Sequence, residues 1–499
     1  MSRQAGNLTG TAPLATAAVS TRLAPFALPA ILALATALRF ANLGENSLWS
    51  DEAYSVIMAQ RDPVEIVHKS AAVDSHPPLY YLLLSAWIAI FGDSEYAVRS
   101  LSAVIGVLVV AVVYLLGRRI AGRRVGLVAS LVAAISPFYL LYSQEARMYI
   151  LAALLAGLSF LAFLHLLELR SRRNAVLYVL ATVLLLYTHV YGLFVLLAQL
   201  IVLLLRTREL PRSARAGELR SWTGIAAAIG VLYLPWLVVI GKQTRDEVRG
   251  TVNTNITWLD TPSPDWLGTT LVQYAGSEAA LVVIGLVCAG AIVVAWRAAR
   301  PGVGPSVVAE AFGGRSAPML ATWLATPIVV PFLISVAFLP IYFPKYTIPA
   351  SVAFYLLLAT AIGRLGRGLA GAIALAAVVA VMLEGAVAYH RTYTTAPWRD
   401  SMAFLAGEAK EGDIVLLDKD FSRTNSFAYY WHREDVVAKE EEEDLVPLPK
   451  RVWVVVSLDP DDPGAVPRRL GRLGFEQTLT RHWDGDVSDV DILLFERAT

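Results

Sequence analysis

The sequence predicts a multi-spanning α-helical membrane protein that ends in a small soluble α/β domain. Hydrophobic residues make up 56% of the 499 residues, charged residues only 17%, and the mean hydropathy is +0.55. Apolar stretches recur at roughly the 20-residue length that an α-helix needs to cross a bilayer. After residue 390 the apolar fraction falls and short strand-like patterns appear.

Eleven apolar stretches are predicted to be membrane-spanning helices. The first begins at Phe26 and lacks a convincing cleavage site, so we expect it to be retained rather than removed as a signal peptide. The segment before it, 1–25, is expected to be cytoplasmic. The predicted spans are 26–43, 97–117, 125–142, 148–167, 175–190, 192–205, 222–240, 279–296, 318–339, 347–362 and 369–388.

A further apolar stretch, 78–91, is too short to span comfortably, and charge decides its assignment. With eleven spans and a cytoplasmic N-terminus, arginine-rich connections such as 118–124 and 206–220 stay in the cytoplasm, as the positive-inside rule requires. Counting 78–91 as a span would place these arginines outside, so it is predicted to be an interfacial helix. Residues 44–96 then form one long extracytoplasmic loop, and 391–499 is also extracytoplasmic.

The C-terminal segment carries short apolar runs that are typical of buried strands. Residues 413–418, 451–456 and 491–495 are rich in Val, Ile and Leu, which suits strands covered on both faces of a small α/β domain. An amphipathic stretch at 402–409 indicates a helix beside them. No glycine-rich nucleotide fingerprint accompanies these strands, which argues against an ATP-driven or NAD-dependent enzyme. Cys288 is the only cysteine, so a disulfide within one chain is excluded.

The long loop 44–96 carries an unusual set of carboxylates. Two adjacent carboxylates follow the first span closely, near the membrane interface, where ionisable groups suggest function. Together with the Asp-x-His pattern further along, they provide a general base with orienting partners. The alternative is interfacial anchoring by an aromatic belt, with the carboxylates simply in water. The residues concerned are Trp49, Asp51, Glu52, Tyr54, Asp74 and His76.

Three cations are expected at the outer ends of spans, where the positive-inside rule disfavours them. These are Arg99, Arg147 and Lys345. Each has a simpler explanation alone, since Arg147 is close to Glu145 in sequence and Lys345 can reach the interface along its own stem. Together they indicate a phosphate site, because Arg offers paired donors and Lys a point charge to phosphoryl oxygens. His189 stands at an outer helix end, and a lone histidine there is more often a packing residue than a metal ligand.

Three sequence motifs resemble those of a known family. Residues 49–54 (Trp-Ser-Asp-Glu-Ala-Tyr), 74–79 and 96–106 resemble, in that order, the opening motifs of dolichyl-phosphate-mannose protein mannosyltransferases and of bacterial lipid A aminoarabinose transferases. These are multi-spanning glycosyltransferases of the GT-C fold that use a polyprenyl-phosphate sugar as donor. The match is specific in the N-terminal third, with 143–149 and 344–346 as weaker echoes. A large luminal insert is not evident, and the α/β tail stands in its place.

The resemblance implies an inverting glycosyltransferase with Asp51 as the base that deprotonates the acceptor hydroxyl. Glu52 would position or polarise neighbouring groups. His76 and Arg99 match positions expected near the lipid phosphate, where they stabilise the leaving group. The looser motifs add Arg147 and Lys345 as phosphate ligands, and the other site candidates are Tyr54, Asp74, Glu145 and His189.

The expected donor is a polyprenyl-phosphate sugar, mannose-like or arabinose-like, and the expected acceptor is an extracytoplasmic protein, lipid or cell-wall glycan. No cofactor and no metal are expected, because electrostatics can stabilise a phosphate leaving group. The alternative is a secondary transporter or lipid-sugar flippase, which should show inverted repeats and ionisable groups at mid-membrane. A structural scaffold would leave the Asp51, His76 and Arg99 series unexplained. The predicted location is the plasma membrane.

Overall fold

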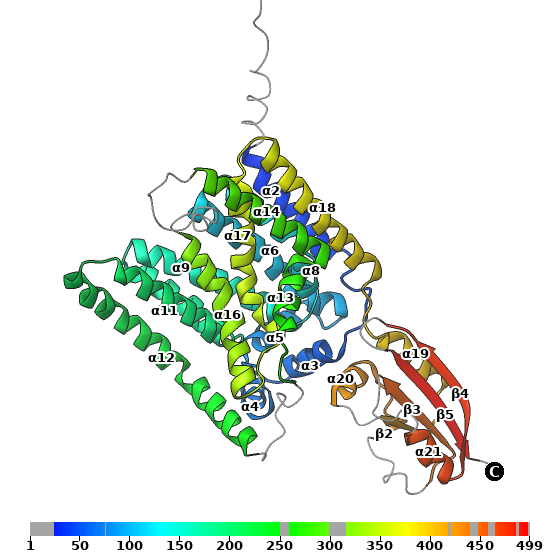
Figure 1. Ribbon diagram of the computed structural model, residues 1–499. Helices are drawn as coiled ribbons and strands as arrows, with labels where there is room; N and C mark the ends of the chain where they lie inside the picture. The colour runs from blue at the N-terminus through cyan, green and yellow to red at the C-terminus, as the bar shows by residue number, and fades with distance from the viewer. Residues whose placement is uncertain are drawn as a thin grey trace, which may run out of the picture.

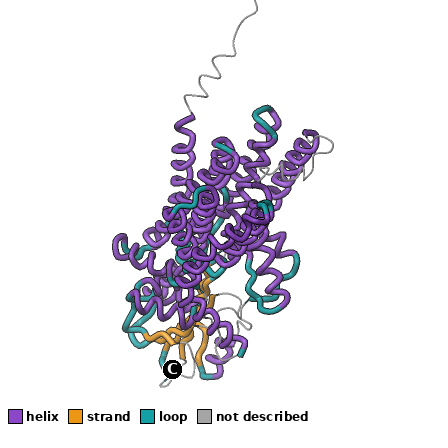
Figure 2. The backbone as a smooth tube through the Cα atoms, turned by 90° about the vertical axis from the view of Figure 1, so that its left-hand side faces the viewer, coloured by secondary structure: helices purple, strands orange, loops and turns teal. Residues whose placement is uncertain are grey.

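The computed structural model describes residues 24–74, 76–249, 259–298, 316–417, 421–439, 448–457, 465–485 and 489–497. The predicted cytoplasmic segment 1–25 lies almost wholly outside these ranges. The described chain forms a helical bundle with a small domain containing a β-sheet beside one end (Figure 1). Figure 2 shows the strands gathered at this same end, below the helices.

All eleven predicted spans fall on helices of the described chain. Within the described ranges, seven helical segments are long and apolar enough to cross a membrane, or eight if one bent pair counts as a single span. The long helices are α6 (Glu95–Ala121), α9 (Tyr149–Glu168), α12 (Arg212–Val248), α14 (Glu278–Ala298), α16 (Ala317–Ala337), α17 (Ile348–Arg364, with the short turn η3, Pro344–Thr347, before it) and α18 (Leu369–Thr392).

The other predicted spans correspond to shorter helices. These are α2 (Ala27–Phe40), α10 (Arg172–Leu186) and α11 (Gly192–Arg208), with 14, 15 and 17 residues. At a rise of about 1.5 Å per residue they extend about 21 to 26 Å, less than the roughly 30 Å of a bilayer core. The chain is therefore a multi-spanning membrane protein, with the three short helices below the length of a standard span.

One predicted span, 125–142, is broken. It forms α7 (Arg123–Ile135) and α8 (Pro137–Ser143), which meet at 61°. Pro137 lacks an N–H and disfavours helical backbone at the residue before it, and Ser136 is accordingly extended. The break leaves carbonyls at the end of α7 without helical partners, and the buried Arg39 of α2 donates to those of Ala133 and Ala134, at 3.2 and 3.0 Å.

Helix α17 forms the centre of the bundle, whereas α12 runs along its edge. Helix α17 is buried along most of its length and contacts α7, α9, α14 and α16. Helix α12 is longer than the predicted span 222–240 and presents large apolar side chains outward, including Val231 and Val238. Figure 1 shows it at the periphery. Outward-facing apolar residues are those expected to contact lipid.

The predicted loop 44–96 is folded into helices. Helix α3 (Ser50–Ala59) begins with a capping interaction in which the Trp49 N–H donates to the Glu52 side chain, at 3.4 Å. Asp62 caps α4 (Pro63–Val73) by accepting two backbone N–H groups. Helix α5 (Leu79–Phe91) covers the stretch that was predicted to be interfacial.

The C-terminal domain is a five-stranded mixed sheet in the order β2-β1-β3-β5-β4. Strand β1 pairs in parallel with β2 and β3, and β5 pairs antiparallel with β3 and β4. The three predicted strands are β1, β3 and β5, and the predicted helix is α19. The elements are α19 (Trp398–Glu408), β1 (Ile414–Leu417), α20 (Phe421–Tyr430), β2 (Val437–Lys439), β3 (Arg451–Ser457), α21 (Ala465–Arg472), β4 (Phe475–Trp483) and β5 (Val490–Arg497).

Two strands of this sheet had no clear sequence signal. Strand β2 has three residues, too few to show a period. Strand β4 is an edge strand with mostly exposed, polar side chains, and edge strands tolerate charge because one side faces water.

Candidate active site

The two adjacent carboxylates of α3 have different partners. Successive helical residues are rotated by about 100°, so neighbouring side chains leave the helix in different directions. Glu52 is fully buried and pairs with Arg99 of α6, with Nε to Oε1 at 2.8 Å and Nη2 to Oε2 at 2.6 Å. Asp51 is partly exposed and lies near Arg147 and Lys345.

Arg99 is saturated with protein acceptors. Besides the two bonds to Glu52, it donates to the backbone carbonyls of Leu43, Asn46 and Ser47, at 3.2, 2.7 and 2.9 Å. A guanidinium has five N–H donors, and these five hydrogen bonds use all of them. Arg99 thus ties α3 and the segment 43–47 to α6, and its predicted contact with a lipid phosphate stays a prediction that would require it to give up one of these acceptors.

Asp51 lies between two cations that come from distant parts of the chain. Its Oδ2 is 3.7 Å from Nη2 of Arg147 and 3.7 Å from Nζ of Lys345. Arg147 also donates to the Asp51 carbonyl and to Ser55 Oγ, both at 3.2 Å. The ion-pair partner of Arg147 is thus Asp51 and not Glu145, the nearer carboxylate in sequence.

The Lys345 ammonium group is held over aromatic rings. It lies 5.2 to 5.4 Å from the ring centroids of Trp49, Tyr149 and Phe343. A cation over a ring face is attracted by the ring quadrupole. This packing directs the ammonium toward Asp51 instead of leaving it free to extend to the interface.

The surroundings of Asp51 keep it ionised. Burial acts to raise its pKa, but the positive charges of Arg147 and Lys345, with a smaller contribution from His76, outweigh this and hold the pKa below its ordinary value. Opposite charge nearby favours the ionised form. Asp51 is therefore a carboxylate at neutral pH, able to accept a proton.

Asp74 orients His76. The buried Asp74 Oδ1 accepts from the His76 backbone N–H at 2.9 Å and lies 3.1 Å from His76 Nδ1. Its Oδ2 accepts from the hydroxyl of Tyr81 at 2.7 Å. Tyr54 packs edge-on against Tyr81, with ring centroids 6.1 Å apart. The predicted Asp-x-His pair thus forms a fixed local unit.

His189 joins the same region from the turn between α10 and α11. Its ring centroid is 5.4 Å from that of His76 and 5.1 Å from that of Tyr346. The ring centroid of Tyr149 lies 6.1 Å from the ring centroids of both His189 and Tyr346. Five chain segments therefore converge near Asp51: α3, the turn before α5, the start of α9, the α10–α11 turn and η3.

Glu145 lies beside Glu52 and Arg99, in the lining of the same cavity. It is buried, and burial raises its pKa to about 8. It lines a small cavity together with Trp49, Tyr389 and Tyr393, and the cavity wall also includes Glu52 and Arg99. The neighbouring Gln144 donates to the carbonyls of Arg39 and Ala41, at 2.9 and 2.7 Å, and so fixes the end of α2.

Sequence reasoning missed the aromatic wall and one partner from the C-terminal domain. Tyr149 and Tyr346 each stand one or two residues after a predicted cation, a signal that could have identified them. Tyr430 of α20 accepts from the Leu48 N–H at 2.7 Å and donates to Glu95 at 3.0 Å. Helix α20 packs on α3, and no local pattern near Tyr430 indicates this contact.

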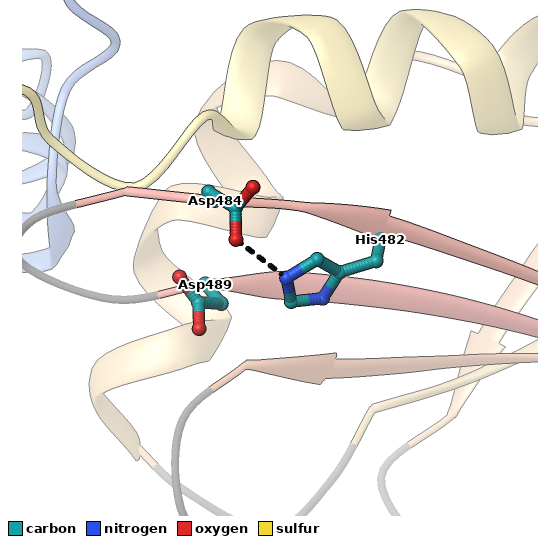
Figure 3. A group of neighbouring side chains, drawn as sticks. All are labelled: His482, Asp484 and Asp489. Atoms are coloured by element: carbon teal, nitrogen blue, oxygen red, sulfur yellow. Dashed lines mark hydrogen bonds and ion pairs between the residues drawn. The ribbon is translucent and has the colours of Figure 1, made fainter.

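A separate group of possible metal ligands lies on the C-terminal sheet. His482, Asp484 and Asp489 bring their ligand atoms within 4.8 Å of one another, and all three are exposed (Figure 3). Both ring nitrogens of His482 are engaged by carboxylates, Nδ1 with Asp491 at 2.6 Å and Nε2 with Asp484 at 2.8 Å. These hydrogen bonds raise the pKa of His482 to about 9. A metal ion at this point would have to displace one of these hydrogen bonds and the proton that it holds.

The fold is similar to that of solved membrane proteins along nearly its full length. ArnT from Cupriavidus metallidurans in the apo state is 14% identical, covers 96% of this chain and 98% of its own, and has a TM-score of 0.60. Its structure bound to undecaprenyl phosphate is 15% identical over the same shares, with a TM-score of 0.58. The apo oligosaccharyltransferase of Archaeoglobus fulgidus is 13% identical, covers 88% of this chain and 70% of its own, and has a TM-score of 0.56.

These likenesses establish the GT-C fold, the fold of membrane glycosyltransferases. In sequence, the family described as dolichyl-phosphate-mannose-protein mannosyltransferase matches residues 75–239, which confirms the predicted resemblance. The comparisons favour a glycosyltransferase over a transporter or flippase. No curated protein sequence matches the chain significantly.

Proposed function

We propose that this protein is an inverting glycosyltransferase that moves a sugar from a polyprenyl-phosphate donor to an extracytoplasmic acceptor hydroxyl. The observation that carries this proposal is a carboxylate, Asp51, with Arg147 and Lys345 both 3.7 Å from one of its oxygens. One point thus holds a proton acceptor beside two groups that bind phosphate. Undecaprenyl phosphate, bound in the similar ArnT structure, is our candidate carrier.

In the proposed step Asp51 removes the proton from the acceptor hydroxyl. The acceptor oxygen attacks the anomeric carbon, the bond from that carbon to the phosphate oxygen breaks, and its electron pair stays on the phosphate. Attack opposite the leaving group inverts the anomeric centre. Arg147 and Lys345 stabilise the negative charge that develops on the leaving phosphate.

Arg147 is a better phosphate ligand than Arg99. Arg99 donates all five of its N–H groups to protein acceptors. Arg147 has an Nε without a hydrogen-bond partner among the described residues, and its contact with the Asp51 carboxylate is a loose 3.7 Å. A buried donor without a partner costs about 1 to 3 kcal/mol, which a phosphate oxygen can offset.

Donor binding also activates the base in this proposal. With both cations nearby, Asp51 has a lowered pKa and is a weak base. A phosphate placed between Arg147 and Lys345 neutralises part of their charge, so the pKa of Asp51 rises toward its ordinary value. The base is then strongest when the donor is in place.

Transfer from radiolabelled polyprenyl-phosphate sugars by purified protein tests this function. A panel with mannose and arabinose donors, and with protein, lipid and glycan acceptors, identifies the substrates. Asp51→Asn is expected to lose at least about a hundredfold in rate, the usual contribution of a general base. Asp62→Asn is the matched control, because Asp62 is an exposed helix cap and Asn caps equally well. Equal transfer by Asp51→Asn and the native enzyme would exclude Asp51 as the base.

We also propose that transfer needs no divalent metal, because the two cations already supply positive charge at the phosphate. Full activity after exposure to EDTA supports this. Activity that EDTA abolishes and only a divalent ion restores contradicts it.

The proposed site requires an extracytoplasmic position for α3 and the C-terminal domain. Cys288 is the only cysteine, so a Cys288→Ser chain can carry one new cysteine at a chosen position. A cysteine at Glu411 should react with a membrane-impermeant maleimide in intact cells, and one at Arg123 should react only after the membrane is opened. The reverse pattern would overturn the orientation.

A further inference from the structure

His189 has one ring nitrogen engaged, and the other is buried with no hydrogen-bond partner in the part of the chain that the structure describes. Its Nδ1 accepts from the backbone N–H of Tyr191 at 3.2 Å. An imidazole nitrogen that accepts an N–H carries no proton, so in the neutral ring the proton is on Nε2. This Nε2 has no hydrogen-bond partner among the described residues, and the side chain is 1% exposed. The turn between α10 and α11 thus presents an N–H donor away from its own backbone.

Burial and nearby groups keep His189 neutral. Burial is the largest cause, and the interactions with His76, Arg147 and Lys345 add to it, so the pKa of His189 is held well below its usual range. The ring also contacts Tyr149, Tyr191 and Tyr346. Its neighbours are therefore the cations of the proposed phosphate site and uncharged hydroxyl-bearing rings.

A buried N–H without an acceptor is unfavourable by about 1 to 3 kcal/mol, and such groups are rare in native proteins. A ligand oxygen arriving beside Arg147 and Lys345 would remove this cost. A purely structural histidine would gain by donating Nε2–H to a nearby protein carbonyl, which this one does not do among the described residues.

We propose that His189 donates its Nε2–H to a phosphate oxygen of the lipid-linked donor, as an uncharged ligand held in one tautomer by the Tyr191 backbone N–H. This inference rests on the proposed function, because it takes the donor phosphate to lie beside Arg147 and Lys345. Arg147 and Lys345 supply positive charge, whereas His189 supplies one oriented hydrogen bond to the phosphate. Because His189 is uncharged, it does not further weaken Asp51 as a base. His189 stays hydrogen-bonded to the phosphate throughout transfer and neither gains nor loses a proton.

The test measures binding of the methyl ester of undecaprenyl phosphate to the full-length protein. This diester has one negative charge that does not titrate between pH 6 and 8, and it carries no sugar to transfer. His189→Phe keeps the ring size and removes the donor, and we expect about a tenfold to hundredfold loss of affinity, in line with a hydrogen bond to a charged group. His189→Gln retains an N–H donor at a similar distance from the backbone and should recover at least part of the loss.

The matched control is His165→Phe, because His165 is an exposed histidine near the end of α9 whose ring, among the described residues, bonds to the Leu161 carbonyl of its own helix. It should bind the diester as the native protein does. The ratio of affinities between the native protein and His189→Phe should be the same at pH 6 and pH 8, since the native ring is uncharged at both. A ratio that falls as pH rises would mean that a charged His189 binds the phosphate, and would overturn the proposal.

Two outcomes separate this inference from the proposed function. If the native protein binds the diester and His189→Phe binds it equally well, His189 is a packing residue and the proposed function stands. If the native protein does not bind the diester, the phosphate site itself is wrong, and the inference fails with it. Thermal unfolding of each variant is measured in parallel, so that lost affinity in a folded protein is distinguished from misfolding.

Discussion

Glu52 and Arg99 form a buried bidentate ion pair that joins α3 to α6, with Nε to Oε1 at 2.8 Å and Nη2 to Oε2 at 2.6 Å. Glu52 also accepts the Ala146 N–H at 2.8 Å, so the segment between α8 and α9 is fixed by the same carboxylate. The next residue toward the N-terminus, Asp51, is therefore held in a set position relative to Arg147. In our proposal Asp51 is the base, whereas Glu52 holds the surrounding segments in place.

Removing Arg99 should destabilise the protein more than it affects donor binding. Arg99→Met leaves the Glu52 charge buried and unpaired, and we expect a loss of about 3 to 5 kcal/mol of stability. The double variant Glu52→Leu with Arg99→Met should recover part of this, because no lone buried charge remains. Thermal unfolding in detergent measures both. An Arg99→Met protein with native stability but strongly weakened donor binding would instead restore the phosphate role predicted from the sequence.

Arg147 and Lys345 should act mainly through donor affinity and the leaving group. Arg147→Met and Lys345→Met should each weaken donor binding by about tenfold to a hundredfold, since each removes a charged hydrogen-bond donor. Arg147→Lys should recover only part, because Lys lacks paired donors. The measurement is KM and kcat with the radiolabelled donor. Arg433→Met removes a surface pair with Asp435 and hydrogen bonds to the carbonyls of Ala406 and Ala409, all within the C-terminal domain, and should leave both constants unchanged.

Glu145 should make stability depend on pH in a defined direction. Burial raises its folded-state pKa to about 8, above the ordinary 4.5. A carboxyl whose pKa is raised on folding contributes full stability below pH 4.5, and stability is lost as pH rises from there to about 8. Glu145→Gln removes this dependence, so the variant should gain Tm relative to the native protein between pH 5 and pH 8.5. A constant Tm difference across that range would show that Glu145 is not buried as a neutral acid.

The C-terminal domain should support the active site through Tyr430. Its hydroxyl accepts the Leu48 N–H at 2.7 Å, just before α3, and donates to Glu95 at the start of α6. Tyr430→Phe leaves that N–H unpaired, and we expect a several-fold lower kcat, with donor KM little changed because the phosphate ligands stay in place. Tyr429→Phe is the matched control, since its hydroxyl bonds only to the exposed Asp93 carbonyl among its described hydrogen bonds. Equal rates for the two variants would show that this contact does not affect catalysis.

Local patterns in the sequence were enough for most of the fold. The eleven apolar stretches all became helices because burying apolar side chains in lipid or in a bundle needs only a run of about 20 such residues. The runs that became β1, β3 and β5 were recognisable because they are apolar on both faces. The break at Ser136 was missed, although Pro137 marks it, because apolar character continues across the bend.

The sequence identified most of the residues that form the candidate site, but it did not show which of them contact one another. Asp51, His76, Arg147 and Lys345 were singled out by charge in unexpected places, and the structure brings all four into one region. Which carboxylate meets which arginine could not be read from the chain, because it depends on the rotation of α3 and on contacts between α3, α6 and the start of α9.

The sequence by itself thus determined a multi-spanning membrane protein with ionisable motifs at the span ends and a small α/β tail, because hydropathy and charge act locally along the chain. Only the tertiary structure decided that Glu52 holds Arg99, that Asp51 meets Arg147 and Lys345, and that α20 packs on α3. These contacts join residues far apart in sequence. The way in which the helices pack against one another determines these contacts, and local sequence patterns do not predict that packing.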